Sequence, residues 1–167
     1  MTLDEINTVD RATFVATLGG IFEHSPWVAD GAVAARPFAG VDALHQAMLA
    51  VVSAASAEQQ LALLRAHPEL AGKAAVRGEL TADSTSEQSG AGLGSCTPGE
   101  FARLQAMNAR YNEKFGFPFI LAVKGYDRAG IIAEFARRVE QDRAAEFAEC
   151  LQQIAKITRF RLDALFG

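Results

Sequence analysis

Residues 97–123, TPGEFARLQAMNARYNEKFGFPFILAV, contain a complete helix signal followed by the one segment that breaks an otherwise helical pattern. Thr97-x-x-Glu100 matches a capping box, and Pro98 occupies the favoured first position of a helix. Five side chains then recur at helical spacing on one face: Phe101, Leu104, Met107, Asn108 and Tyr111. We therefore predict a long helix from Thr97 that stops at Phe115-Gly116.

The segment Phe117–Val123 is short, apolar and rich in aromatic and branched residues, and Gly116 and Gly125 bound it. Periodicity alone does not separate a buried strand from an extended connector. A single strand has no ladder partner in a helical chain. The unpaired N–H and C=O groups of such a segment are therefore candidates for binding a ligand.

Working outward, the rest of the chain also has helical patterns. Phe14, Leu18 and Phe22 recur every four residues after Asp10, which predicts one apolar stripe on one helix. Further helices are expected over residues 42–53, 57–66, 81 to about 90, 127–140 and 143–165. The prediction is an all-α fold: a single-domain helical bundle of about seven to eight helices, with one extended connector, over residues 1–167.

Composition excludes several functional classes. Half of the residues are hydrophobic and the net charge is −4, so neither disorder nor an anionic partner such as nucleic acid or a membrane surface is expected. No apolar stretch approaches the roughly 20 residues that span a bilayer. The acidic start and the final Leu165-Phe166-Gly167 show no secretory or peroxisomal signal, so a cytoplasmic location is expected. Cys96 and Cys150 are isolated, which favours neither disulfides nor a thiolate metal site.

His67-Pro68 is the first candidate for chemistry. Proline disfavours helical geometry in the residue before it, so the sequence places an imidazole where a helix must end. Ser84, Glu87 and Gln88 lie at helical spacings of three and four, on one face of the next helix. Both features could instead have a purely structural role, because a histidine often caps a helix and Ser84-x-x-Glu87 is itself a capping-box pattern. Thr81 competes for that N-cap, which would place Ser84 and Glu87 inside the helix.

Arg161 interrupts an apolar helix face, where it either extends its charge to water or binds a carboxylate or ureido group bidentately. A metal site is poorly supported, because His67 and Glu87 lack HExxH spacing. A Ser84–His67–Glu87 triad is conceivable, but no nucleophile-elbow motif is present. From the residues alone, the prediction is an acid–base pocket that uses no cofactor and no metal.

Taken together, these motifs resemble those of the 2-oxo-4-hydroxy-4-carboxy-5-ureidoimidazoline (OHCU) decarboxylases, over nearly the whole chain. The segments that carry the resemblance are Phe22-Glu23-His24-Ser25-Pro26-Trp27, His67-Pro68-Glu69-Leu70-Ala71-Gly72, Leu80–Ser84 with Glu87-Gln88, Phe115–Phe119, and Lys156-Ile157 with Arg161-Leu162. The resemblance implies an all-α homodimer without metal or organic cofactor. It implies that His67 is the catalytic acid or base, assisted by Glu87, and that Arg161 also takes part.

The resemblance further implies a small ureidoimidazoline substrate, decarboxylated to (S)-allantoin during urate breakdown. The implied substrate contacts are Pro68, Ser84, Thr85, Ser86, Glu87, Gln88, Phe119, Ile120, Leu121, Ala122, Val123 and Arg161. A hydrolase of a related ureide or cyclic amide is the enzymatic alternative. A helical binding module with an apolar groove is the non-enzymatic alternative.

Overall fold

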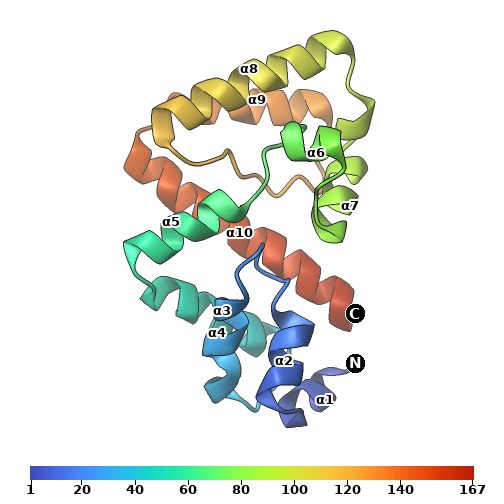
Figure 1. The fold of residues 1–167 in the computed structure, drawn as a ribbon, viewed down its shortest axis with the longest axis vertical. Helices are drawn as coiled ribbons and strands as arrows, with labels where there is room; N and C mark the ends of the chain where they lie inside the picture. The colour runs from blue at the N-terminus through green and yellow to red at the C-terminus, as the bar shows by residue number, and fades with distance from the viewer. The chain divides into compact units, whose positions relative to one another are not determined.

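A computed structural model describes residues 1–167 and contains ten α-helices, two short 3-10 helices and no strand (Figure 1). The predicted all-α fold is confirmed. Eight of the helices have seven or more residues, and the two others, α1 and α6, are shorter. The expected count of seven to eight helices therefore matches the longer helices.

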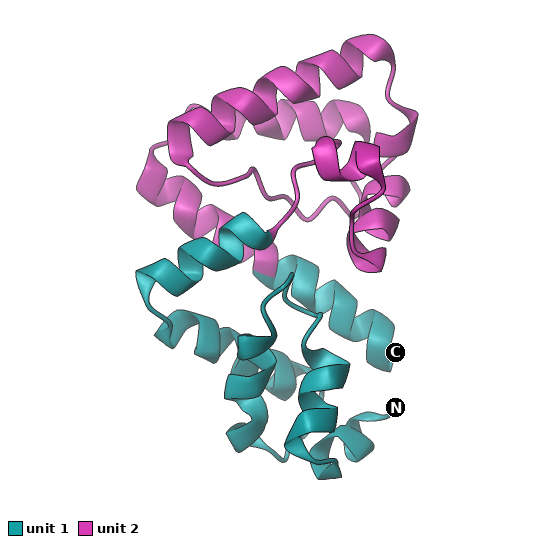
Figure 2. Cartoon of the chain, viewed as in Figure 1, with its two compact units in different colours: residues 1–66, 155–167 teal, residues 67–154 magenta.

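The chain forms two compact units, which Figure 2 shows in different colours. Unit 1 comprises Met1–Ala66 and Ala155–Gly167, and unit 2 comprises His67–Ile154. The last helix, α10 (Arg143–Phe166), supplies residues to both units. That residues 1–167 behave as one domain stays a prediction.

Unit 1 is built from the first five helices, a 3-10 turn and the end of α10. The elements are α1 (Leu3–Thr8), α2 (Arg11–Leu18), α3 (Pro26–Ala32), η1 (Val33–Ala35), α4 (Val41–Ala54) and α5 (Ala57–Ala66). Helix α3 packs against α2 and α4. Buried apolar side chains such as Phe14, Leu18 and Met48 form the core of this unit.

The helix predicted from Asp10 is shorter than its apolar stripe. Asp10 accepts a hydrogen bond from Thr13 N and caps α2, but the helix ends at Leu18 and does not reach Phe22. Two consecutive glycines follow Leu18, and glycine disfavours helix continuation. Phe22 is still buried, so the stripe correctly marked the core although it overran the helix.

Two helix boundaries next to the candidate site follow the sequence prediction. Helix α5 ends at Ala66, directly before His67-Pro68. Helix α7 (Ala82–Gly90) begins after Thr81, whose hydroxyl accepts a hydrogen bond from Ser84 N at 3.2 Å. Thr81 is therefore the N-cap, and Ser84 and Glu87 lie inside the helix, so their capping-box reading is wrong.

Unit 2 contains the remaining helices and the predicted connector. Its elements are α6 (Lys73–Arg77), α7, η2 (Leu93–Ser95), α8 (Pro98–Phe115), α9 (Arg128–Arg138) and the first part of α10. Helices α8 and α9 contact each other, and residues 117–126 connect them without regular secondary structure (Figure 1). The rings of Phe115, Phe117, Phe119 and Phe135 pack around Tyr111, so the connector is covered by an aromatic core.

Helix α8 buries a face that differs from the predicted one at its first turn. Leu104, Asn108, Tyr111 and Phe115 are buried, whereas Phe101 is 36% exposed. Phe101 lies in the first turn after the cap, where it borders a cavity described below. Asn108 is the one polar residue on the buried face of α8, which is otherwise apolar.

The α8 cap provides a first test of how the sequence specifies the fold. Thr97 Oγ1 accepts from Glu100 N at 3.1 Å, and Glu100 Oε1 accepts from Thr97 N at 3.0 Å. We expect Thr97→Ala to lower the free energy of unfolding by about 1 kcal/mol, measured by urea denaturation. Thr97→Ser keeps the hydroxyl and serves as the control. Equal urea midpoints for the two variants would contradict the capping role.

No helix taken singly is long and apolar enough to cross a membrane, although α4 and α5 together meet that criterion as a pair bent by 120°.

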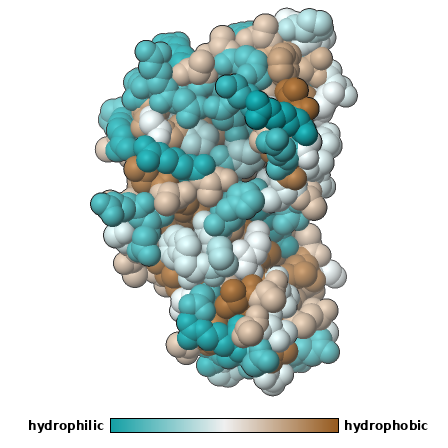
Figure 3. All heavy atoms as spheres, in the orientation of Figure 1, coloured by the Kyte–Doolittle hydropathy of each residue, from teal (hydrophilic) through white to brown (hydrophobic).

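On the face drawn in Figure 3, the most hydrophobic residues are interspersed with hydrophilic ones. The large apolar side chains that remain exposed come from distant parts of the chain: Met1, Val76, Phe101, Tyr126, Phe160 and Leu165.

Candidate active site

His67 begins a short loop, residues 67–72, that we call the His67 loop. His67 itself is 6% exposed. Ala71 has a φ of +50°, in the left-handed region that residues with a Cβ rarely adopt. A Cβ on Gly72 would lie 2.7 Å from Glu69 Cβ, so the chain turns back tightly here and position 72 requires glycine. The His67 loop therefore has a constrained backbone.

Helix α7 divides the predicted Ser84–Gln88 cluster between its buried and exposed sides. Ser84 and Gln88, one turn apart, are both buried. Glu87 is half-buried, whereas Thr85 and Ser86 are exposed. The buried side of α7 thus presents a hydroxyl and an amide, with the Glu87 carboxylate beside them on the helix.

The Gln88 side chain joins α7 to the His67 loop. Its Oε1 accepts a hydrogen bond from Ala71 N at 3.0 Å, and its Nε2 donates to Glu69 O at 3.3 Å. The structure therefore brings together residues that lie 17 and 19 positions apart in the sequence. Both ends of this amide bind main-chain groups, so Gln88 fixes the loop directly. Binding of substrate by the same amide stays a prediction.

The connector Phe119–Val123 is buried along its length, and other side chains hold part of its backbone. Arg138 Nη1 donates to Ile120 O at 2.5 Å, and Ala122 N donates to Gln153 Oε1 at 3.0 Å. Val123 O accepts from Tyr126 N at 2.9 Å. These groups are engaged within the protein. The structure gives the N–H and C=O groups of Phe119 and Leu121 no such bond, which makes them the better candidates for a ligand.

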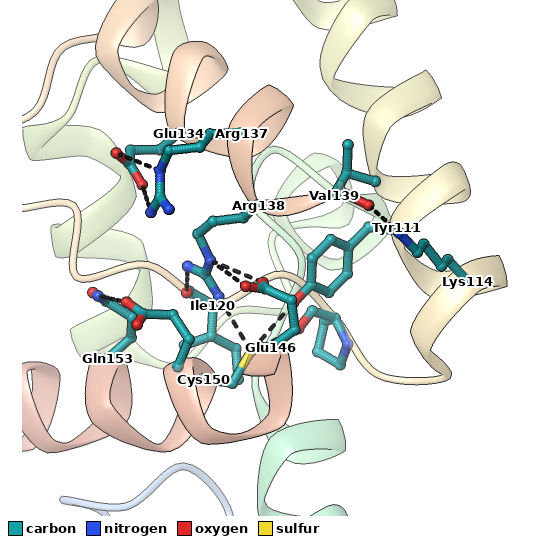
Figure 4. Close-up of polar contacts among 12 residues, drawn as sticks. Tyr111, Lys114, Ile120, Glu134, Arg137, Arg138, Val139, Glu146, Cys150 and Gln153 are labelled. Carbon is teal, nitrogen blue, oxygen red and sulfur yellow. Dashed lines mark hydrogen bonds and ion pairs between the residues drawn. The ribbon is translucent and has the colours of Figure 1, made fainter. Parts of the chain in front are cut away.

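A buried polar network supports the connector (Figure 4). Arg138 and Glu146 form an ion pair at 2.9 Å, with side chains 0% and 2% exposed. Tyr111 Oη donates to Glu146 Oε1 at 2.6 Å, and Arg138 also contacts Cys150 Sγ. Burial raises the pKa of the Tyr111 hydroxyl far above its ordinary value, so the phenol stays protonated and remains a donor.

Cys150 is a structural residue of this network. Burial raises the pKa of its thiol above the ordinary value, and thiols react as thiolates. Cys150 is therefore a protonated, inert side chain at neutral pH.

Arg161 belongs to unit 1, whereas the other predicted site residues belong to unit 2. Its Nη1 donates to Glu23 Oε2 at 2.8 Å and to Ile21 O at 3.2 Å. The side chains of Arg161 and Glu23 are 4% and 1% exposed. Arg161 therefore does not extend its charge to water, and it forms a buried ion pair.

The other two histidines, His24 and His45, lie in unit 1. His45 Nε2 lies 3.0 Å from Thr158 Oγ1, and burial lowers the pKa of its imidazole below the ordinary value. His45 is accordingly a neutral core histidine at pH 7. His24 is exposed.

Unit 2 also contains a cavity of about 460 Å³ next to α7. Ala71, Thr85 and Gln88 contribute to its lining, together with apolar side chains that include Leu80, Leu93 and Phe101. The cavity borders the end of the His67 loop and not His67 itself. Across the chain, no group of three or more His, Cys, Asp or Glu side chains is arranged to share a metal ion.

The family model described as OHCU decarboxylase matches residues 7–163. The chain belongs to this family. The matched range includes the His67 loop, α7, the connector and Arg161.

Curated relatives support the assignment to this family. The 2-oxo-4-hydroxy-4-carboxy-5-ureidoimidazoline decarboxylase of Haloferax volcanii is 42% identical, and the match covers 100% of this chain and 97% of the relative. The mouse protein of the same name is 40% identical, with 100% and 94% covered. The Bacillus subtilis uric acid degradation bifunctional protein PucL is 42% identical over 96% of this chain, which spans only 32% of that longer protein.

Solved structures show the same family fold. A crystal structure of (S)-allantoin synthase has a TM-score of 0.79 and 30% identity, with 99% of this chain and 54% of that chain covered. A crystal structure of an OHCU decarboxylase, determined in the presence of (S)-allantoin, has a TM-score of 0.71 at 20% identity, with 95% and 99% covered. The second likeness concerns the fold alone.

Several residues that hold the candidate site together could not be recognised from the sequence. They are Gln105, Asn108 and Asn112 of α8, Arg138 of α9, and Glu146 and Gln153 of α10. One signal was present: Asn108 lies on the apolar face of its predicted helix, where a polar residue needs a hydrogen-bond partner. Nothing in the sequence indicated that the partner of Asn108 would be Leu70 O, a main-chain carbonyl of the His67 loop.

Proposed function

We propose that this protein decarboxylates OHCU to (S)-allantoin in uric acid degradation, without a cofactor. The observation that carries the proposal is the full-length match to OHCU decarboxylases, together with the bonding of the His67 loop to α7 in unit 2. The names of the relatives supply the substrate and the reaction class. The site supplies an imidazole, a carboxylate and a hydroxyl on adjoining segments.

The chemistry of the substrate makes a cofactor unnecessary. Decarboxylation leaves an electron pair that must be delocalised, usually into a cofactor. OHCU has a hydroxyl and a carboxylate on one ring carbon and a C=N bond at the neighbouring carbon. When the bond to the carboxylate breaks, CO₂ leaves, the electron pair forms a C=C bond between the two ring carbons, and the nitrogen of the former C=N bond gains a proton. The hydroxyl then loses its proton to become the carbonyl of allantoin, and the neighbouring carbon gains a proton.

In this proposal His67 transfers the proton on the hydroxyl or the ring, and Glu87 orients the imidazole. Ser84 and main-chain groups of the connector, those of Phe119 and Leu121 above all, hold the ureido and ring amide edges of the substrate. Delivery of the proton to one face of the ring gives one enantiomer. The role of Arg161, in unit 1, rests on the family resemblance alone.

The proposed assembly is a homodimer and the proposed location is the cytoplasm. Light scattering of the purified protein tests the first, because a monomer mass would contradict it. Fractionation of the source cells tests the second.

The decisive experiment follows freshly prepared OHCU by circular dichroism in the presence of the protein. We expect a rapid signal of (S)-allantoin together with release of CO₂, because unassisted decay of OHCU gives racemic product. A racemic product formed at the rate without enzyme would overturn the proposed function. A ureide or cyclic amide hydrolase would instead cleave a ring or ureido C–N bond without releasing CO₂.

A further inference from the structure

We propose that the amide side chains of Gln105 and Asn108 on α8, acting with Gln88, are positioning residues that hold the His67 loop in its reactive geometry. This inference rests on the proposed function. It assigns a catalytic consequence to a face of α8 that the family motifs do not include. We call Gln88, Gln105, Asn108 and Asn112 together the amide cradle.

The amide cradle binds three consecutive residues of the loop. Gln105 Nε2 donates to Ala71 O at 2.5 Å, and Asn108 Nδ2 donates to Leu70 O at 3.0 Å. Asn112 Nδ2 donates to the Glu69 carboxylate at 2.6 Å. Gln88 completes the set with its bonds to Ala71 N and Glu69 O. Neutral amides thus engage main-chain groups from Glu69 through Ala71.

The spacing of the α8 residues explains how one helix reaches the whole loop. Positions 105, 108 and 112 are three and four residues apart, which places them on one side of a helix. Helix α8 therefore combines a buried apolar row, which includes Leu104 and Tyr111, with a row of amides in which Asn108 is buried and the two others are half-buried. Asn112 Nδ2 also donates to Asn108 O, which links two members of the cradle.

The backbone of Ala71 shows why such a cradle is needed. A left-handed φ in a residue with a Cβ carries a conformational cost and persists only where its surroundings enforce it. The N–H of Ala71 is bound by Gln88 and its C=O by Gln105, so the strained residue is held on both sides. Without these bonds, Ala71 would relax toward negative φ.

Relaxation at Ala71 would be transmitted to His67. Pro68 has a fixed φ and restricts the residue before it, so the segment between His67 and the clamped residues has little freedom to absorb a change. A displacement of about 1 Å in a reacting group costs on the order of 100-fold in rate. The cradle therefore acts on turnover through the orientation of the imidazole.

Asn108→Leu is the primary test, and Asn7→Leu is its matched control. Asn108 Oδ1 is buried without a partner, so leucine removes one unsatisfied acceptor at similar volume. It also leaves Leu70 O without its donor, and because these two effects oppose each other the variant should fold. Asn7 in unit 1 likewise bonds a loop backbone, at Phe38 N and Phe38 O. We expect Asn108→Leu to lower kcat about 10- to 100-fold with little change in KM. Asn7→Leu should lower only the melting temperature.

Gln105 provides a rescue test. Gln105→Met removes the donor to Ala71 O and should lower kcat, whereas Gln105→Lys retains a donor of similar reach and should restore most of it. The ring signals of His67 in NMR spectra should shift in Gln105→Met and return in Gln105→Lys. Normal kcat in both Asn108→Leu and Gln105→Met would overturn the inference, as would equal loss of kcat in Asn7→Leu. Failure of the proposed function is distinct, because the unmodified protein would then give racemic product.

Discussion

Replacing His67 with alanine should abolish the optical signal of (S)-allantoin while leaving the protein folded. General acid–base catalysis by one positioned side chain typically contributes about 10²–10⁴-fold to a rate. We therefore expect kcat to fall by at least about 100-fold, measured by circular dichroism with fresh OHCU. The remaining product should approach the racemate, because the proton would then come from water on either face.

His45→Ala is the matched control for His67→Ala. His45 and His67 are both 6% exposed, so both substitutions remove a buried imidazole and leave a comparable space. His45 bonds Thr158 in unit 1 and has no place in the proposed mechanism. We expect His45→Ala to lower the melting temperature but to leave the enantiomeric excess of the product intact. Retained turnover in His67→Ala would remove His67 from the mechanism.

The second large effect concerns stability, at the Arg138–Glu146 ion pair. Glu146→Ala leaves the fully buried guanidinium of Arg138 without its carboxylate and Tyr111 without its acceptor. Removing one partner of a buried ion pair costs about 3–5 kcal/mol, because the remaining charge stays desolvated. We expect a loss of this size in the free energy of unfolding, measured by urea denaturation.

Two further variants test whether the stability loss in Glu146→Ala comes from the unpaired buried charge or from losing any carboxylate. The double variant Arg138→Met with Glu146→Leu replaces the pair by apolar side chains of similar volume and should recover much of the loss. Glu140→Ala breaks the exposed pair with Arg110, whose side chains are 63% and 64% exposed, and should leave stability almost unchanged. A Glu146→Ala protein as stable as Glu140→Ala would contradict the role given to this pair.

Most of the fold could be predicted from local signals in the sequence. Thr81 and Thr97 cap their helices as expected, and His67-Pro68 ends α5 at Ala66. Such signals depend on residues within one turn of each other, so a single sequence contains them. Apolar spacing predicted the ends of helices less reliably. Phe22 continues the four-residue spacing of Phe14 and Leu18, but α2 ends before Gly19 and Gly20.

The candidate site could be predicted only in part. The motifs indicated His67, Ser84 and Glu87 as site residues, and the structure places all three in unit 2. The hydrogen bond from Arg138 to Ile120 O, by contrast, depends on how α9 packs against the connector. The two bonds from Gln88 to the His67 loop are likewise long-range contacts. No periodicity or spacing rule contains such contacts, because they form only when distant segments meet.

The amide cradle has a consequence for attempts to build this activity elsewhere. A designer who copies only residues 67–72 onto another helical scaffold would transfer the imidazole but not the left-handed turn at Ala71, which depends on Gln88 and Gln105. The smallest piece that carries the His67 loop in its observed conformation therefore extends from His67 through α8. A library that varies α8 while keeping the motif fixed would alter turnover without altering a single residue that contacts substrate.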